Sequence, residues 1–223
     1  MMTTIPCPLE TSVVIDNPTI QGQKMTILPA DILHIAAQFV SRDAMKPALS
    51  GISIKPVLTE TSGILTAIEI CSTDGHRMFR CNIPVENTSF FLDSHIVVGA
   101  AAFKKKVGKA STVRLSLDGT KMVSFYGCKD ELISASPCEI LDVNFPMYNQ
   151  LWPNDFQNIP GRPISFNAAY LASFLKEVDS CSNNSIATMN MNTPTTPLTF
   201  SADHSSYANV KLEYLLMPVQ LRV

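Results

Sequence analysis

Ser72-Thr73-Asp74-Gly75-His76-Arg77-Met78 is the part of the sequence that most strongly indicates the fold. Strand-like runs precede it from Ile64 to Ser72 and follow it from Met78 to Pro84. Thr-Asp-Gly between two such runs is typical of a turn, and Gly75 adopts backbone conformations that other residues avoid. The segment therefore predicts two strands joined by a tight connection.

This pair of strands belongs to a pattern that occurs three times: a short strand-like run, an amphipathic helix, and two or three strands. In the first copy, Lys24 to Leu28 leads to Pro29, which suits the first turn of a helix. The apolar helix face comprises Ile32, Leu33, Ala36, Phe39 and Val40, and the strands are Gly51 to Pro56, Ile64 to Ser72 and Met78 to Pro84.

The second copy begins with His95 to Val98 and continues with a helix from about Ala100 to Val107, which Gly108 ends. Asp118-Gly119 predicts a hairpin turn between the first two strands that follow. The predicted strands are Val113 to Leu117, Met122 to Tyr126 and Leu132 to Ala135.

In the third copy, Ile164 to Phe166 leads to Asn167, a favourable N-cap residue. The helix stripe comprises Tyr170, Leu171, Phe174, Leu175 and Val178, and the strands are Ile186 to Met191, Leu198 to Ala202 and Asn209 to Met217. Hairpin-connected strands without long parallel crossovers predict an α+β fold, with amphipathic helices packed on one face of antiparallel sheets.

The composition is that of an ordinary globular chain, with 223 residues, 46% hydrophobic, 16% charged, and a formal net charge of -2. Its apolar runs are shorter than the roughly 20 residues of a membrane span. Met1 to Glu10 lacks the features of a secretion signal, so we expect a cytoplasmic protein with no membrane partner. The six scattered cysteines then favour neither disulfides nor zinc, and we expect no cofactor.

Three short motifs resemble, in the same order, those of the bacterial sliding clamp, the beta subunit of DNA polymerase III. Ser72 to Met78 is similar to the family's ATDGHRL, Asn144 to Pro153 (NFPMYNQLWP) to RFPDYRRVLP, and Met217 to Leu221 (MPVQL) to MPMRL. The resemblance extends from about Lys24 to Leu221. It implies the DNA-clamp fold and a non-catalytic processivity factor for DNA replication.

The resemblance also implies a domain organisation. Residues 24–153 would form a clamp domain of two half-repeats, and residues 164–223 a C-terminal half-repeat or a reduced second domain. Residues 154–163 are interpreted as a proline-containing linker and residues 1–23 as an N-terminal extension. A family subunit has three domains of two half-repeats, so we expect the first domain to be absent. Because an unpaired half leaves an apolar helix face and sheet edges uncovered, we predict a homo-oligomer, either a four-chain ring or an open dimer.

The family's peptide-binding pocket can be carried over onto residues from distant parts of the chain. One wall would comprise Thr73, Gly75, His76, Arg77 and Met78, and the other wall would comprise Met217, Pro218 and Val219. The floor would comprise Leu49 and Leu151, and Pro146 is a further predicted pocket residue. The implied partners are short extended peptides with leucine or phenylalanine anchors, from a DNA polymerase or another DNA-processing enzyme. Gln150 and Gln220 replace basic residues of the family. Arg77 as a structural ion-pair partner and His76 as a half-buried, satisfied histidine are alternatives.

Sequence-independent contact with double-stranded DNA requires Lys and Arg on helices that face phosphates. The candidates follow the first helix or lie on the second: Arg42, Lys46, Lys104, Lys105, Lys106 and Lys109. A solvated charged face is the alternative interpretation. The resemblance allows for a clamp loader as a further partner.

Two other functions remain open. A clamp-derived adaptor would bind a peptide without encircling DNA. A small hydrolase would use Asp74 and His76, with His95 or Asp203-His204, as metal ligands or as acid and base. The absence of HExxH, GxSxG, P-loop and GxGxxG motifs disfavours the hydrolase.

Overall fold

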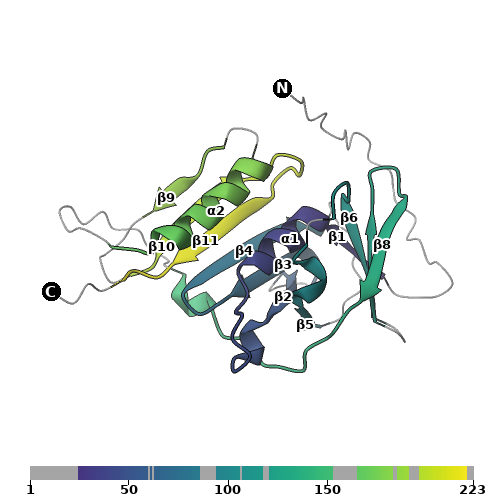
Figure 1. The fold of residues 1–223 in the computed structure, drawn as a ribbon, viewed down its shortest axis with the longest axis horizontal. Coiled ribbons are helices and arrows are strands. Elements are labelled where there is room, and N and C mark those ends of the chain that lie inside the picture. Colours follow the sequence, from purple (N-terminus) through teal and green to yellow (C-terminus); the bar gives the residue numbers. More distant parts are fainter. Residues whose placement is uncertain are drawn as a thin grey trace.

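The computed structural model describes residues 25–59, 61, 63–85, 94–105, 107–117, 121–152, 165–182, 185–190 and 196–219. These residues form two antiparallel sheets and two α-helices, which confirms the predicted α+β class (Figure 1). The expected extension 1–23, the expected linker 154–163 and the Asp118-Gly119 turn lie outside the described residues. No helix in the described ranges has the length and apolar character needed to cross a membrane.

The larger sheet has seven strands in the order β5-β2-β3-β4-β11-β10-β9. These strands are β5 (Ile96–Gly99), β2 (Gly51–Leu58), β3 (Leu65–Thr73), β4 (Arg77–Pro84), β11 (Lys211–Leu216), β10 (Leu198–Asp203) and β9 (Thr188–Asn190). Antiparallel pairing of β4 with β11, in which Arg77 lies opposite Leu216, joins the first repeat to the third.

The smaller sheet shows that the first two repeats exchange strands. Its order is β1 (Met25–Pro29), β6 (Thr112–Ser116), β7 (Met122–Tyr126) and β8 (Leu132–Pro137). Strand β1 belongs to the first repeat but pairs with β6 of the second, and β5 belongs to the second repeat but pairs with β2 of the first. Each repeat therefore completes the sheet of the other.

The first helix, α1 (Ala30–Gln38), is buried on most sides. It lies over β2, β3 and β4 and packs against the short 3-10 helix η3 (Ala100–Phe103), where His34 Nδ1 lies 2.9 Å from the Phe103 carbonyl oxygen. The apolar face was expected to reach Val40, but the helix ends at Gln38 because the Phe39 amide donates to Ala36 and tightens the last turn.

The predicted second helix from Ala100 to Val107 is wrong in length. Only Ala100–Phe103 is helical, and it is a 3-10 turn. Consecutive lysines follow it and Gly108 comes shortly after, so a longer helix would bring like charges together and order a glycine. Phe103 is the last buried apolar residue of the turn.

The helix of the third repeat, α2 (Ala168–Cys181), begins as predicted at Asn167, whose side-chain oxygen accepts a 3.0 Å hydrogen bond from the Ala169 amide. The strand expected before it is not formed at Ser165 and Phe166, while Ile164 lies outside the described residues. In Figure 1, α2 lies in front of the β9–β11 half of the larger sheet.

An aromatic cluster joins the first and third repeats beneath the two α-helices. Phe39 stacks on Phe79 and contacts Tyr214, and Tyr214 stacks on Phe174 with ring centroids 4.6 Å apart. These four side chains are almost completely buried. Since burying such a side chain contributes about 1.5–3 kcal/mol, this contact makes the junction between β4 and β11 part of the main core.

Candidate functional site

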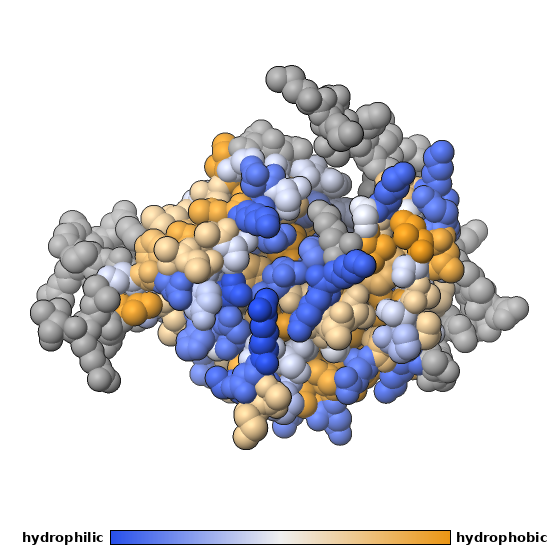
Figure 2. Space-filling view, in the orientation of Figure 1, coloured by the Kyte–Doolittle hydropathy of each residue, from blue (hydrophilic) through white to orange (hydrophobic). Residues whose placement is uncertain are grey.

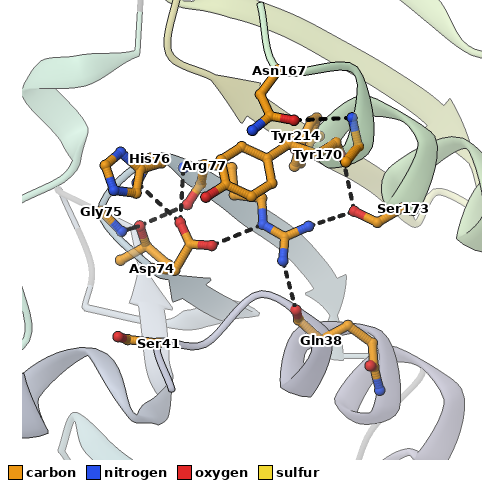
Figure 3. A network of polar contacts seen from close by, with 12 residues as sticks. Gln38, Ser41, Asp74, Gly75, His76, Arg77, Asn167, Tyr170, Ser173 and Tyr214 are labelled. Atoms are coloured by element: carbon orange, nitrogen blue, oxygen red, sulfur yellow. Dashed lines mark hydrogen bonds and ion pairs between the residues drawn. The ribbon is translucent and has the colours of Figure 1, made fainter. Parts of the chain in front are cut away.

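The turn between β3 and β4 is held by side chains of the motif itself. Thr73 Oγ1 donates to the Arg77 carbonyl at 2.8 Å and accepts from the Gly75 amide at 3.1 Å. Asp74 Oδ1 accepts from the amides of His76 and Arg77. Gly75 has a φ of +93°, which favours glycine at this position. The loop is thus held by its own side chains, with Thr73 buried and Gly75 and His76 exposed at the tip (Figure 3).

The Arg77 guanidinium points away from the loop tip, into the seam between α1 and α2 (Figure 3). Its Nε lies 2.9 Å from Asp74 Oδ2, and its other nitrogens donate to the Gln38 carbonyl and to Ser173 Oγ. The central carbon of the guanidinium, Cζ, lies 4.8 Å from the ring centres of both Phe39 and Tyr170. Arg77 therefore has the ion-pair role that the sequence left as an alternative.

His76 is exposed rather than half-buried, and its ring lies 6.2 Å from that of Tyr170. Its carbonyl oxygen accepts a 3.1 Å hydrogen bond from the Met217 amide. This bond connects the loop to the segment after β11, 141 positions away in the chain. The two walls that the resemblance implied are thus in direct contact.

The segment after β11 presents apolar side chains beside the loop. Met217 and Val219 are exposed, while Pro218 is half-buried. The Val219 amide donates to the Ser165 carbonyl at 2.7 Å, which fixes the segment beside the start of α2. Extended backbone with exposed apolar side chains is suited to contact with a peptide.

A small apolar cluster lies below these walls. Met78, Leu215, Cys71 and Tyr148 are buried together, with Phe145 and Trp152 packed against them. Tyr148 donates to Glu69, and burial is the main cause that raises the pKa of the Tyr148 hydroxyl far above its ordinary value. The cluster therefore anchors the segment around residues 145–152 to the sheet.

The remaining predicted pocket residues lie at different places around this cluster. Leu49 is next to the loop, since a Cβ atom added at Gly75 would be 3.7 Å from Leu49 Cδ1. Leu151 is exposed at 44% of its surface. Pro146 instead lines a neighbouring hollow of about 390 Å³, which also has Ser53, Lys55, His95, Phe145, Met147, Tyr148, Asn149 and Gln150 along it.

The basic candidates gather near the ends of α1 and η3. Arg42, Lys104, Lys105 and Lys109 are exposed, and Lys106 lies outside the described residues. Gln38 Nε2 donates to the Lys104 carbonyl at 3.3 Å, so the end of α1 lies beside the start of the lysine run.

Lys46 also lies after α1, but its charge has a local partner. Its Nζ is 4.0 Å from Asp43 Oδ2, and both side chains are about half exposed. An exposed pair of this kind is weak and leaves the ammonium accessible to another anion.

The residues of the hydrolase alternative are held at separate places. Asp74 is engaged with Arg77, His95 Nε2 lies 2.9 Å from Ser53 Oγ, and His204 Nε2 lies 3.0 Å from Asp31. Within the described part of the chain, no three His, Cys, Asp or Glu residues are grouped as a metal site would require. This arrangement gives no support to the hydrolase.

Comparison with solved structures identifies the architecture. The chain resembles the beta subunit from DNA polymerase of Streptococcus pyogenes (17% identity, TM-score 0.60), covering 87% of this chain and 65% of that chain. It also resembles the DNA polymerase III beta subunit of Thermotoga maritima, with 13% identity and a TM-score of 0.60, and the sliding clamp of Bartonella birtlesii bound to griselimycin, with 16% identity and a TM-score of 0.61. Both matches cover 89% of this chain and 66% of the other chain. The fold is that of a bacterial sliding clamp.

The expected clamp fold is thereby confirmed, over a chain that spans less than two thirds of the length of these clamp structures. No protein-family model and no curated protein sequence matches the chain. The likeness therefore lies in the fold, at sequence identities of 13–17%.

The structure adds residues to the site of this clamp fold that the sequence prediction omitted. Tyr148 and Trp152 pack under the walls, and Arg80 lies 3.9 Å from the centre of the Trp152 ring while pairing with Glu213. The sequence signal for these two residues was the aromatic content of the NFPMYNQLWP segment. Large aromatic side chains such as Tyr148 and Trp152 are usually packed on an apolar surface.

Proposed function

We propose that this chain is a non-catalytic, clamp-type scaffold that binds a short extended peptide between the Thr73–Arg77 loop and the segment from Met217 to Val219. The peptide would belong to a DNA polymerase or another DNA-processing enzyme, which the clamp would hold at DNA. The hydrogen bond between His76 and Met217 carries the proposal, because it brings together two walls from distant parts of the chain.

The chemistry of the walls supports an apolar peptide. Leu151, Met217 and Val219 expose apolar surface around the buried Met78 cluster, and methionine adapts to different side chains. Two leucine or phenylalanine anchors would contribute about 1.5–3 kcal/mol each, less the cost of ordering the peptide. We therefore expect an affinity in the micromolar range, on the order of 8 kcal/mol in total with backbone contacts included.

In the proposed function the protein acts in the cytoplasm during DNA replication and assembles as a homo-oligomer. The exposed lysines after η3 would meet phosphates without reading base sequence. Attachment to DNA would raise the concentration of the bound enzyme at its substrate. A clamp loader would be needed if the assembly is a closed ring, whereas an open adaptor would bind peptide alone.

Peptide binding can be tested by fluorescence polarisation, with a labelled extended peptide carrying two leucines and a phenylalanine. Met217→Ala and Leu151→Ala should each weaken binding about tenfold, because each removes exposed apolar surface from the site. Met45→Ala serves as the matched control, since Met45 is also exposed but lies in the loop after α1. Unchanged affinity in both site variants would remove the peptide site from this location.

Gly75 is unsuitable for this experiment. Any side chain there would be strained at a φ of +93°, so lost binding could reflect a distorted loop instead of a blocked site.

A further inference from the structure

The two α-helices occupy matching positions in their repeats but differ in burial. Six of the nine residues of α1 are buried, compared with three of the fourteen residues of α2. The difference arises because α1 has a sheet on one side and η3 of the second repeat on another. Among the described residues, no helix of a neighbouring repeat packs on α2 in the same way.

The surface that α2 leaves uncovered is apolar toward the start of the helix, while Lys176, Asp179 and Ser180 are exposed toward its end. Leu175 is 43% exposed on the helix, Met189 is exposed on β9 opposite Phe200, and Phe166 is exposed just before the helix. The helix also exposes the small residues Ala168, Ala169 and Ala172, which permit close approach of another helix. Figure 2 shows this end of the molecule as a pale-orange to orange surface over α2 and β9.

The sheet at this end has a second unfilled position. In the first two repeats, the first strand after each helix, β2 or β6, receives the strand that precedes the helix of the other repeat. Strand β9 holds the same place in the third repeat, and within the described ranges it pairs with β10 alone. The residues that precede α2, Ser165 and Phe166, form no strand. In the described part of the chain, the outer edge of β9 is therefore open, and the segment before α2 makes no strand pairing, the Ser165 carbonyl accepting instead from the Val219 amide.

We propose that a second copy of this chain covers the α2–β9 face, so that two third repeats together form one complete clamp domain. In this dimer, α2 would pack on α2 about a two-fold axis, and the segment before each helix would pair with β9 of the other copy. A second copy is the expected partner because the first two repeats already pair by exchanging strands in this way, β1 with β6 and β5 with β2. In a dimer with a two-fold axis both copies use the same surface, so that surface has to be complementary to itself.

The inference deepens the homo-oligomer of the proposed function by naming its surface, but it does not depend on peptide binding. It also gives the outer edge of β9, which spans three of the described residues, a strand to pair with from the other chain. The exposed apolar side chains at this face would be removed from water in the same step.

The test is the mass of the full chain by light scattering over a concentration series. We expect at least twice 24.4 kDa, and we expect Leu175→Glu combined with Met189→Glu to reduce the mass to that of one chain. Met45→Glu is the control for an added glutamate, because it places one such charge at a residue that is 88% exposed in the loop after α1. Circular dichroism should show that all three proteins are folded.

A second measurement places the contact on α2. In a Cys7→Ser, Cys128→Ser background, which removes the exposed Cys128 thiol and the Cys7 thiol that lies outside the described residues, Leu175→Cys should form a disulfide-linked dimer on mild oxidation, and Met45→Cys should not. A wild-type monomer at all concentrations would overturn the inference. So would a dimer that the double Glu variant leaves intact and that Leu175→Cys fails to cross-link.

The two proposals fail separately in these experiments. Peptide binding by a chain that stays monomeric would leave the proposed scaffold function standing without this interface. A dimer that is lost on changing Leu175 and Met189, in a protein that binds no peptide, would support the interface and contradict the peptide site.

Discussion

Arg77 shows how one residue of the Thr73–Arg77 loop can have a structural role. Its guanidinium pairs with Asp74 of the loop, donates to the end of α1 and to Ser173 of α2, and lies between two aromatic rings. Loop, first repeat and third repeat therefore meet at one cation. The loop tip keeps its shape because the residue after it is fixed in the interior.

This position predicts a large stability effect for Arg77→Ala. The substitution would leave the Asp74 carboxylate unpaired at a largely buried position and open a gap beside Phe39, so we expect the free energy of unfolding to fall by about 3 kcal/mol. Lys46→Ala, which breaks the exposed pair with Asp43, should change it by less than about 1 kcal/mol. Urea unfolding at a fixed protein concentration gives both values.

Equal effects of the two substitutions would contradict the structural role. If Arg77 instead served the peptide, Arg77→Ala would weaken peptide binding while leaving the unfolding midpoint unchanged.

At the scale of the element, α2 presents adjacent residues to two different environments. Phe174 is fully buried against Tyr214, whereas Leu175 faces outward. Phe174→Ala should lower the free energy of unfolding by about 3–5 kcal/mol, because it leaves a cavity in the aromatic cluster. Leu175→Ala, measured at a dilution where the chain is monomeric, should change it by less than about 1 kcal/mol. Thermal unfolding of the two variants side by side checks this.

A similar loss for both variants would mean that Leu175 is buried within the single chain. The α2 face would then be covered without a second copy, and the proposed interface would have to be abandoned.

The elements also show which features a sequence can predict. The Asn167 cap and the periodic stripe of α2 are local signals that predicted the helix correctly, although Leu175 of that stripe is exposed instead of packed on the sheet. The second helix was wrong because its apolar start at Ala100 and Phe103 suggested more helix than the following lysines allow. The exchange of β1 and β5 joins segments far apart in the chain, and no local pattern specifies it.

The candidate site followed the same rule. The turn at Thr73 to Arg77 could be predicted from its own residues, and its contact with Met217 was implied by the family resemblance alone. The inward direction of the Arg77 side chain depends on Gln38 and Ser173, which lie 39 and 96 positions away in the chain, so the sequence left it open.

For the whole molecule, the arrangement of helices decides where DNA would lie. Figure 1 places α1 and α2 on the same side of the larger sheet, and Lys104 lies beside the end of α1. A two-fold axis that passes between the two α2 helices, normal to this helix layer, would keep the lysines of both copies on one face. The proposed dimer and the proposed DNA contact are therefore compatible in one assembly.

The lysines after η3 then predict the salt dependence of DNA binding. Each phosphate contact contributes about 0.9 to the slope of log affinity against log salt concentration, so Lys104→Glu with Lys105→Glu should reduce the slope by about 2 per chain. Lys121→Glu with Lys129→Glu makes the same charge change at exposed residues on either side of β7 in the smaller sheet. Titrations of labelled duplex DNA between low and moderate salt compare the two pairs. If both pairs reduce the slope equally, the DNA responds to net charge alone, and the helix face is not its binding surface.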